Sequence, residues 1–286
     1  MSSHSTLIPV ASLQAELSDV FLADCSHDLA APAAGEQAYA EAHIPGAVHF
    51  HLDRDLSARP SGRNGRHPLP TREALAATLA ARGLRDGQQV VAYDGSQGVY
   101  AARLWWLLRW LGHPHVAVLD GGLQAWTAAG GATEAGAARP RPAGDFRARP
   151  SLVEHVDVDA VLANVHSGAR LVVDARSSQR FAGVGETLDP IAGHIPGAVC
   201  RFFRDNLAEN GCFKPAAALH AEWLTRLGGR APSTVIHQCG SGVSACHNLL
   251  AMQHAGLSGS VLYPGSWSEW CSDTTRPVAM GPETVG

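Results

Sequence analysis

The sequence predicts an α/β protein of two tandem domains, each a mostly parallel sheet flanked by helices. Three observations lead to this fold class. The chain of 286 residues is longer than a usual single domain. The same short motifs occur twice at nearly constant spacing, and in both halves short apolar runs alternate with helical patterns.

The repeated motifs also fix the domain organisation. Their offsets of 151, 145 and 144 residues are nearly equal, as a tandem duplication predicts. Between the halves, a proline- and arginine-rich run at residues 139–144, followed by Pro150, indicates a linker. We therefore expect one domain at residues 1–144 and a second at 145–286. The repeated pairs are residues 43–48 and 194–199 (HIPGAV in both), 91–96 and 236–241, and 120–126 and 264–270.

Each half contains three predicted strands and three predicted helices. Buried strands with little alternation, separated by helices, are typical of a parallel sheet covered on both faces. Ligands of such sheets bind beyond the carboxyl ends of the strands, where turns lead into helices. The strands are expected at 20–23, 89–93, 115–119, 170–173, 234–238 and 260–263, and the helices at 72–81, 100–111, 123–129, 216–227, 243–254 and 267–271.

The composition is that of an ordinary globular protein, with 45% hydrophobic and 17% charged residues. A net charge of -4 gives no general attraction to nucleic acid or to an anionic membrane, so we expect neither partner. An anionic substrate would therefore need a local positive site. No apolar run reaches the ~18 residues of a spanning helix, and the N-terminus lacks the pattern of a signal peptide.

Cysteine and histidine spacing limits two further classes. The six cysteines form no CxxC pair and no compact disulfide pattern, which favours a reducing, cytoplasmic location. The fifteen histidines show no His/Cys cluster with ligand spacing, so we expect no metal.

Cys239 carries the strongest chemical signal. It directly follows a predicted strand, and a Gly-Ser-Gly turn then leads into a helix near Val243. Gly240 and Gly242 permit a tight turn whose N–H groups can converge on an anion, and the helix start adds its positive end. Both effects favour a thiolate. The alternative, a buried core thiol, is the usual fate of a free cysteine, but this context disfavours it. The first half has Asp94 at the matching position, so only the second half should be catalytic.

The loop at residues 239–245, CGSGVSA, is similar to the active-site loop of 3-mercaptopyruvate sulfurtransferases, where threonine is usual at the position of Ser244. The HIPGA motifs, the Asp-Gly-Gly-x-x-x-Trp motif ending at Trp126, and residues 265–270 (GSWSEW) also resemble that family. The resemblance extends from about residue 7 to 277. It implies two rhodanese-like domains, a non-catalytic one followed by a catalytic one, without a metal or an organic cofactor.

The resemblance also implies a reaction. Cys239 would take sulfur from a small anionic donor, 3-mercaptopyruvate, and pass it as a persulfide to an acceptor such as cyanide, a thiol or a thioredoxin-like protein. This is covalent catalysis in two steps. Backbone N–H groups of the loop would stabilise the anionic sulfur. The loop residues expected to bind substrate in this way are Gly240, Gly242, Val243 and Ser244.

The resemblance assigns four further side chains. Arg176 corresponds to an arginine that binds the donor's carboxylate or sulfonate, a task that suits its planar fork; the alternative is a surface arginine. Asp53, His67 and Ser241 match a trio proposed to act near the sulfur, with His67 as proton carrier. A solvated loop histidine is the alternative for His67.

One departure from the family pattern keeps the identity of the donor open. The family generally carries a second arginine shortly before the second HIPG motif, but residues 183–190 contain none and have acids instead. Arg180, Arg201 and Arg204 are candidates to replace it. Thiosulfate therefore stays an alternative donor, although the Cys-Gly-Ser loop favours mercaptopyruvate. A non-catalytic sulfur-trafficking module is a second alternative, whereas a cysteine phosphatase is disfavoured because its loop needs an arginine where Ala245 stands.

Overall fold

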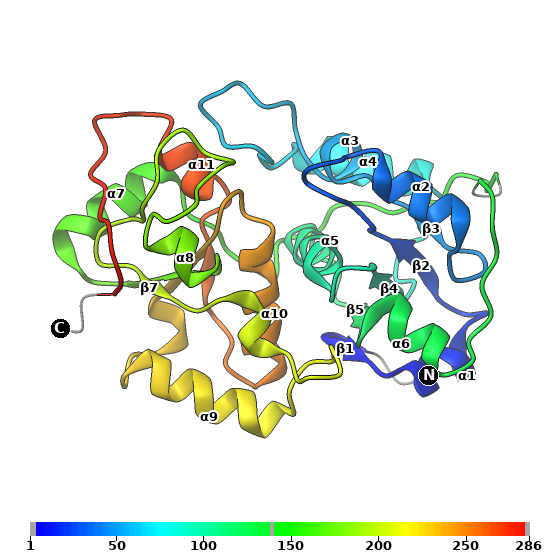
Figure 1. Cartoon of the computed structure of the whole chain (residues 1–286). Coiled ribbons are helices and arrows are strands. Elements are labelled where there is room, and N and C mark those ends of the chain that lie inside the picture. Colours follow the sequence, from blue (N-terminus) through cyan, green and yellow to red (C-terminus); the bar gives the residue numbers. More distant parts are fainter. Residues whose placement is uncertain (1–3, 138–139, 284–286) are drawn as a thin grey trace. The chain divides into compact units, whose positions relative to one another are not determined.

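The computed structural model describes residues 4–137 and 140–283 and divides into two compact units (Figure 1). Unit 1 consists of the described parts of Met1–Ala58, Leu69–Leu152 and Glu209–Phe213. Unit 2 consists of those of Arg59–Pro68, Val153–Ala208 and Lys214–Gly286. Two short segments, residues 59–68 and 209–213, thus belong to the unit that their sequence position does not suggest.

The predicted linker has no regular structure where it is described. Residues 140–152 contain neither helix nor strand, and Arg139 lies outside the described residues. The predicted boundary between residues 144 and 145 stays a prediction. Each unit also contains a short segment from the other half of the sequence, so no single position in the sequence separates the two units.

Unit 1 is built on a parallel five-stranded sheet in the order β1-β5-β4-β2-β3. Non-consecutive neighbours require crossovers, and helices supply most of them, as parallel pairing demands. The elements are β1 (Leu7–Ile8), α1 (Val10–Glu16), β2 (Phe21–Asp24), α2 (Ala34–Glu41), β3 (Val48–His49), α3 (Leu52–Asp55), α4 (Arg72–Ala81), β4 (Val90–Tyr93), α5 (Val99–Trp110), β5 (Val116–Leu119) and α6 (Gly122–Ala128).

Helices cover both faces of this sheet. One face packs against α1, α2 and α6, through a core that includes Leu13, Tyr39 and Trp126. The helix α5 packs on β4 and β5 and is buried along almost its whole length. A strand covered on both faces is buried at every position, which explains why β2, β4 and β5 have no buried/exposed alternation.

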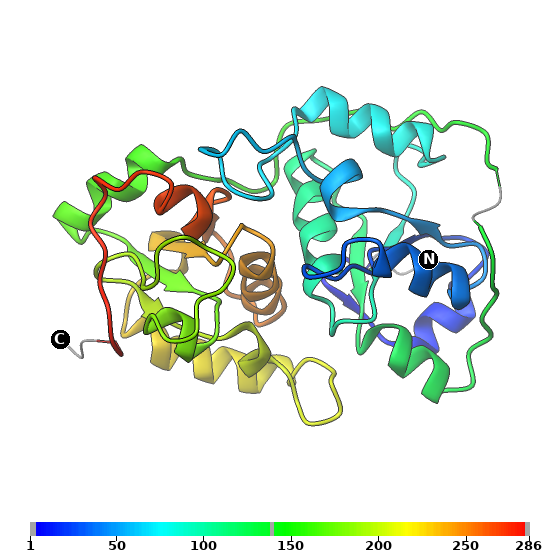
Figure 2. The same ribbon diagram turned by 45° about the horizontal axis from the view of Figure 1, so that its top comes forward.

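Unit 2 repeats the architecture with a parallel four-stranded sheet in the order β7-β6-β8-β9 (Figure 2). Its helices again lie on both sides of the sheet. The elements are α7 (Val158–Ser167), β6 (Leu171–Asp174), α8 (Ser178–Phe181), β7 (Val199–Cys200), the 3-10 turn η1 (Phe203–Asn206), α9 (Ala216–Leu227), the 3-10 turn η2 (Pro232–Thr234), β8 (Val235–Gln238), α10 (Ser244–His254), β9 (Val261–Leu262) and α11 (Ser266–Trp270).

The two faces of the second sheet have different cores. Val172 and Ile236 face a cluster that contains residues of α7, α8 and α11, among them Trp267 and Trp270. His237, the next residue along β8, faces the other side, where its ring meets Trp223 of α9 and the sulfur of Met252 in α10. Burial lowers the pKa of His237 to about 3, so this histidine is a neutral core residue.

The predicted α/β class is confirmed, and so are all twelve predicted elements, whose ends differ by at most one residue from those observed. Three of the two-residue strands (β1, β3 and β7) and the four-residue helices α3 and α8 were not predicted, because so short a segment carries no periodic pattern. The helix α7 was not predicted either, although Asp157 caps this helix by accepting a hydrogen bond from Ala160 N–H. Among the described residues, no helix has the length and apolar character needed to cross a membrane.

Unit 1 ends β4 in the turn that matches the Cys239 turn of unit 2, but with Asp94 at its start. The buried Asp94 carboxylate accepts four backbone hydrogen bonds, all between 2.6 and 2.9 Å. The turn therefore converges its N–H groups on one carboxyl group, as the sequence predicts for this geometry. The donors are the N–H groups of Ser96, Gly98, Tyr100 and Ala101.

We predict that Asp94→Asn lowers the stability of unit 1 by about 1–3 kcal/mol, because an amide NH₂ would face N–H donors and leave them unsatisfied. Amide hydrogen exchange of α5, followed by mass spectrometry, measures this loss. The exposed Asp19→Asn is the matched control and should leave exchange unchanged. Equal exchange rates in both variants would mean that the four hydrogen bonds contribute nothing to the stability of unit 1.

Candidate active site

Cys239 directly follows β8, and the loop 239–243 connects it to α10. The side chain is buried, and the N–H of Gly242 donates a hydrogen bond to its Sγ at 3.2 Å. Gly242 has a φ of 75°, and a Cβ there would collide with the carbonyl oxygen of Pro264. Only glycine therefore allows this loop to turn its N–H toward the sulfur.

The first turn of α11 fixes the same loop from outside. The N–H groups of Trp267 and Ser268 donate to the carbonyl oxygens of Cys239 (3.0 Å) and Gly240 (2.9 Å). The hydroxyl of Ser266 accepts the Cys239 N–H at 3.1 Å and donates to Tyr263 O. Ser266 adopts a φ of 54°, which is uncommon for a serine. Sequence reasoning missed this residue, although it lies in the noted GSWSEW motif.

The structure brings two of the predicted catalytic residues together. His67 Nδ1 lies 2.7 Å from Ser241 Oγ, and both side chains are buried. His67 reaches this position because the segment Arg59–Pro68 belongs to unit 2. The other predicted loop residues occupy the start of the helix, with Val243 as the N-cap and Ser244 as the first residue of α10.

Arg176 lies deep in unit 2, with 3% of its surface exposed. Its Nε and Nη2 donate to both oxygens of Asp174, Nη2 also donates to Gly193 O, and the guanidinium stacks on the Trp267 ring at 4.9 Å. Burial alone would lower the pKa of Arg176, but Asp174 outweighs burial and holds it above the ordinary value. Protein groups thus occupy Nε and Nη2, whereas the buried Nη1 makes no hydrogen bond among the described residues and lies 3.7 Å from Oε2 of Glu186. The predicted donor-binding role of Arg176 stays a prediction.

Two other arginines lie at the cysteine loop. A Cβ added to Gly240 would be 2.8 Å from Nη2 of Arg66 and 3.6 Å from Nη1 of Arg180. Of the three candidate replacements for the missing arginine, Arg180 is therefore the one beside the loop. Arg201 instead pairs with Glu222 at 2.6 Å, and Arg204 stacks on neighbouring phenylalanine rings.

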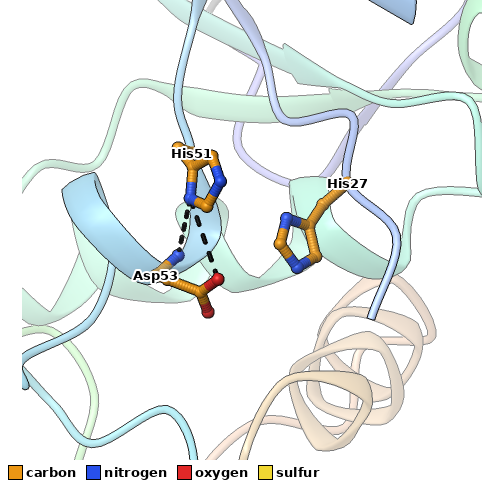
Figure 3. Close-up of side chains that lie close together, drawn as sticks. All are labelled: His27, His51 and Asp53. Atoms are coloured by element: carbon orange, nitrogen blue, oxygen red, sulfur yellow. Dashed lines mark hydrogen bonds and ion pairs between the residues drawn. The ribbon is translucent and has the colours of Figure 1, made fainter. Parts of the chain in front are cut away.

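Asp53, the remaining predicted residue, lies in α3 of unit 1 beside His51 and His27 (Figure 3). The ligand-type atoms of these three residues lie within 4.8 Å of one another, so they form a group that could hold a cation. His51 Nδ1, however, already accepts the Asp53 N–H at 3.1 Å and caps α3. This protein contact accounts for the orientation of His51. The catalytic role of Asp53 stays a prediction.

Comparison with known proteins agrees with the duplicated architecture. The model of the Rhodanese-like domain matches twice, at residues 10–129 and 157–273. The Pseudomonas aeruginosa protein named "Probable 3-mercaptopyruvate sulfurtransferase" is 47% identical over 283 residues, 98% of this chain and 99% of that protein. The Mycobacterium tuberculosis protein "Putative thiosulfate sulfurtransferase SseB" is 39% identical over 86% of each chain. The solved 3-mercaptopyruvate sulfurtransferase from Leishmania major superposes with a TM-score of 0.82 at 30% identity, covering 93% of this chain and 74% of that one.

We predict that Arg176→Gln lowers the free energy of unfolding by about 3–5 kcal/mol, because it leaves the Asp174 carboxylate buried and uncompensated. Chemical denaturation measures this loss, with the exposed Arg230→Gln as control. If Arg176 instead serves only to bind a donor, the variant would keep its stability and raise the KM for the donor.

Proposed function

The chain belongs to the family of proteins built from Rhodanese-like domains and is a sulfurtransferase, and from this premise we propose that it moves sulfane sulfur from 3-mercaptopyruvate to a thiophilic acceptor through a persulfide on Cys239. One observation carries the proposal: the Gly242 N–H donates to the Cys239 sulfur at 3.2 Å, at the end of a parallel strand. The name of the Pseudomonas aeruginosa relative supports the choice of donor.

In the first step, the Cys239 thiolate attacks the sulfur of the donor. A new S–S bond forms as the C–S bond of mercaptopyruvate breaks, and its electron pair leaves on the pyruvate enolate. One proton then converts the enolate to pyruvate, and the enzyme holds a persulfide. The loop N–H groups stabilise negative sulfur before and after the transfer, without reorganisation.

In the second step, an acceptor nucleophile attacks the outer sulfur of the persulfide. The S–S bond breaks, and its electron pair returns to Cys239 as a thiolate. Cyanide would leave as thiocyanate, and a thiol would leave as a new persulfide. We extend the proposal to thiols and thioredoxin-like proteins as acceptors. A cytoplasmic location stays a prediction.

Ser241 and His67 supply the proton route in this proposal. Their 2.7 Å contact joins a hydroxyl in the loop to an imidazole, the side chain best suited to hold or release a proton near pH 7. Because both groups are buried, the proton would pass between fixed positions with little loss to bulk water. We propose that this pair delivers the proton that the pyruvate enolate needs.

Arg180 is our candidate for binding the donor's carboxylate. Its Nη1 lies next to Gly240, whereas Glu186 and Asp189 hold its other nitrogens at 3.0 Å. Thiosulfate stays the second candidate donor, because the Mycobacterium tuberculosis relative is named for it. With thiosulfate, the same attack would release sulfite. A comparison of the initial rates with 3-mercaptopyruvate and with thiosulfate distinguishes the two candidate donors.

We predict that Cys239→Ser abolishes turnover, because the hydroxyl cannot form the persulfide, and that it leaves the fold intact. Brief exposure to 3-mercaptopyruvate should add about 32 Da, one sulfur atom, to the wild-type protein and to the control Cys212→Ser, but nothing to Cys239→Ser. Absence of the adduct from the wild-type protein would favour a non-catalytic sulfur-trafficking module.

We predict that Ser241→Ala and His67→Gln each lower kcat/KM by about 10²-fold or more, because each breaks the proton route. The double variant should lose little more than either single variant, since residues that act as a unit are not additive. Steady-state kinetics of the three variants test this. Additive losses would show that Ser241 and His67 act separately.

A further inference from the structure

Two guanidinium groups from distant parts of the sequence meet beside Gly240. Arg66 comes from the segment Arg59–Pro68, and Arg180 comes from α8. The Nη2 of Arg66 and the Nη1 of Arg180 are among the atoms that a Cβ on Gly240 would meet first, at 2.8 and 3.6 Å. Both guanidinium groups therefore lie at the residue that follows the persulfide-forming cysteine.

Asp189 joins these two arginines. Its Oδ1 accepts from Nη1 of Arg66, and its Oδ2 accepts from Nη2 of Arg180 at 3.0 Å. The Asp189 side chain is 2% exposed, so the pair of contacts is fixed inside unit 2. Glu186 holds a further edge of Arg180 through Nε and Nη2, both at 3.0 Å.

The acids leave one amino group of each arginine for another partner. Within residues 4–137 and 140–283, neither Nη2 of Arg66 nor Nη1 of Arg180 makes a hydrogen bond, and these are the nitrogens close to Gly240. Both side chains keep contact with solvent, at 29% and 24% exposed. Two N–H-bearing groups that lie beside the same residue can together bind a planar anion.

We propose that Arg66 is a donor-binding and specificity-determining residue, which grips the carboxylate of a 2-oxo acid thiol together with Arg180. This inference rests on the proposed function and deepens it. Residues 183–190 lack the arginine that the family resemblance leads one to expect, and they supply Asp189 instead. Asp189 is a positioning residue that holds Arg66, so the second cation comes from another loop.

A purely structural role for Arg66 makes a different prediction. The backbone N–H of Arg66 donates to Ser268 Oγ at 3.0 Å, and the next residue is His67. If the Arg66 side chain only anchored this segment, its loss would disturb the proton route and lower kcat without weakening carboxylate binding. The test must therefore separate binding from chemistry.

Pyruvate is the probe that separates them, because it has the 2-oxo acid group of the donor and no sulfur to transfer. We expect Arg66→Gln to raise both the KM for 3-mercaptopyruvate and the inhibition constant of pyruvate by about 10- to 100-fold, the loss of a charged hydrogen bond. The kcat should change much less. Arg63→Gln removes an exposed arginine from the same segment and should leave both constants unchanged.

Arg66→Lys and Asp189→Asn complete the experiment. Lysine keeps the charge but not the fork, so pyruvate should bind with intermediate strength, and this variant serves if the glutamine variant does not fold. Asp189→Asn should weaken pyruvate binding by releasing Arg66. Unchanged constants in Arg66→Gln, or a fall in kcat alone, would overturn the inference. Persulfide formation on Cys239 in the same variants reports on the proposed function independently.

Discussion

The direction of the peptide groups after β8 is the constraint on which the rest of the site depends. A loop that turned its carbonyl oxygens toward Cys239 would repel a thiolate, whereas one that turns N–H groups inward stabilises it. Two features enforce the second arrangement. The first turn of α11 binds the carbonyl oxygens of Cys239 and Gly240 from outside, and Gly242 adopts a backbone conformation that a side chain would prevent. The Cys239 sulfur thus receives the Gly242 N–H from the fold itself.

The matching turn of the first domain begins with an acidic side chain in place of the cysteine. In unit 1, four N–H groups converge on the carboxylate of Asp94, which begins the matching turn. The turn has kept its capacity to hold an anion, but a resident side chain satisfies it. The turn begins with Asp94 and not with a cysteine, and each of its four N–H groups already has the Asp94 carboxyl group as acceptor. The turn of unit 1 is thus filled by its own carboxyl group, whereas the matching turn of unit 2 begins with Cys239, which is why we assign the chemistry to unit 2.

Much of the fold could be predicted from sequence because its buried strands are short apolar runs that alternate with longer helical segments. The place of Cys239 followed from the same pattern. Side-chain partners could not be predicted in this way. Arg176 and Arg180 are four residues apart and equally charged, yet Asp174 takes the fork of Arg176, and only Arg180 lies beside Gly240. Of residues 59–68, which belong to unit 2, the family resemblance assigned only His67 to the site and gave its neighbour Arg66 no role.

The arginines of unit 2 also show how a chain with a net charge of -4 can recognise an anion. Three arginines are matched there by three acids: Asp174 holds Arg176, and Glu186 and Asp189 hold the others. The cluster thus has no net charge to attract a donor from a distance. What it offers in the proposed site is position, because the acids bind one side of Arg66 and Arg180 and leave one amino group of each beside Gly240. Recognition then depends on the fit of a planar carboxylate and much less on the long-range field, which salt would screen.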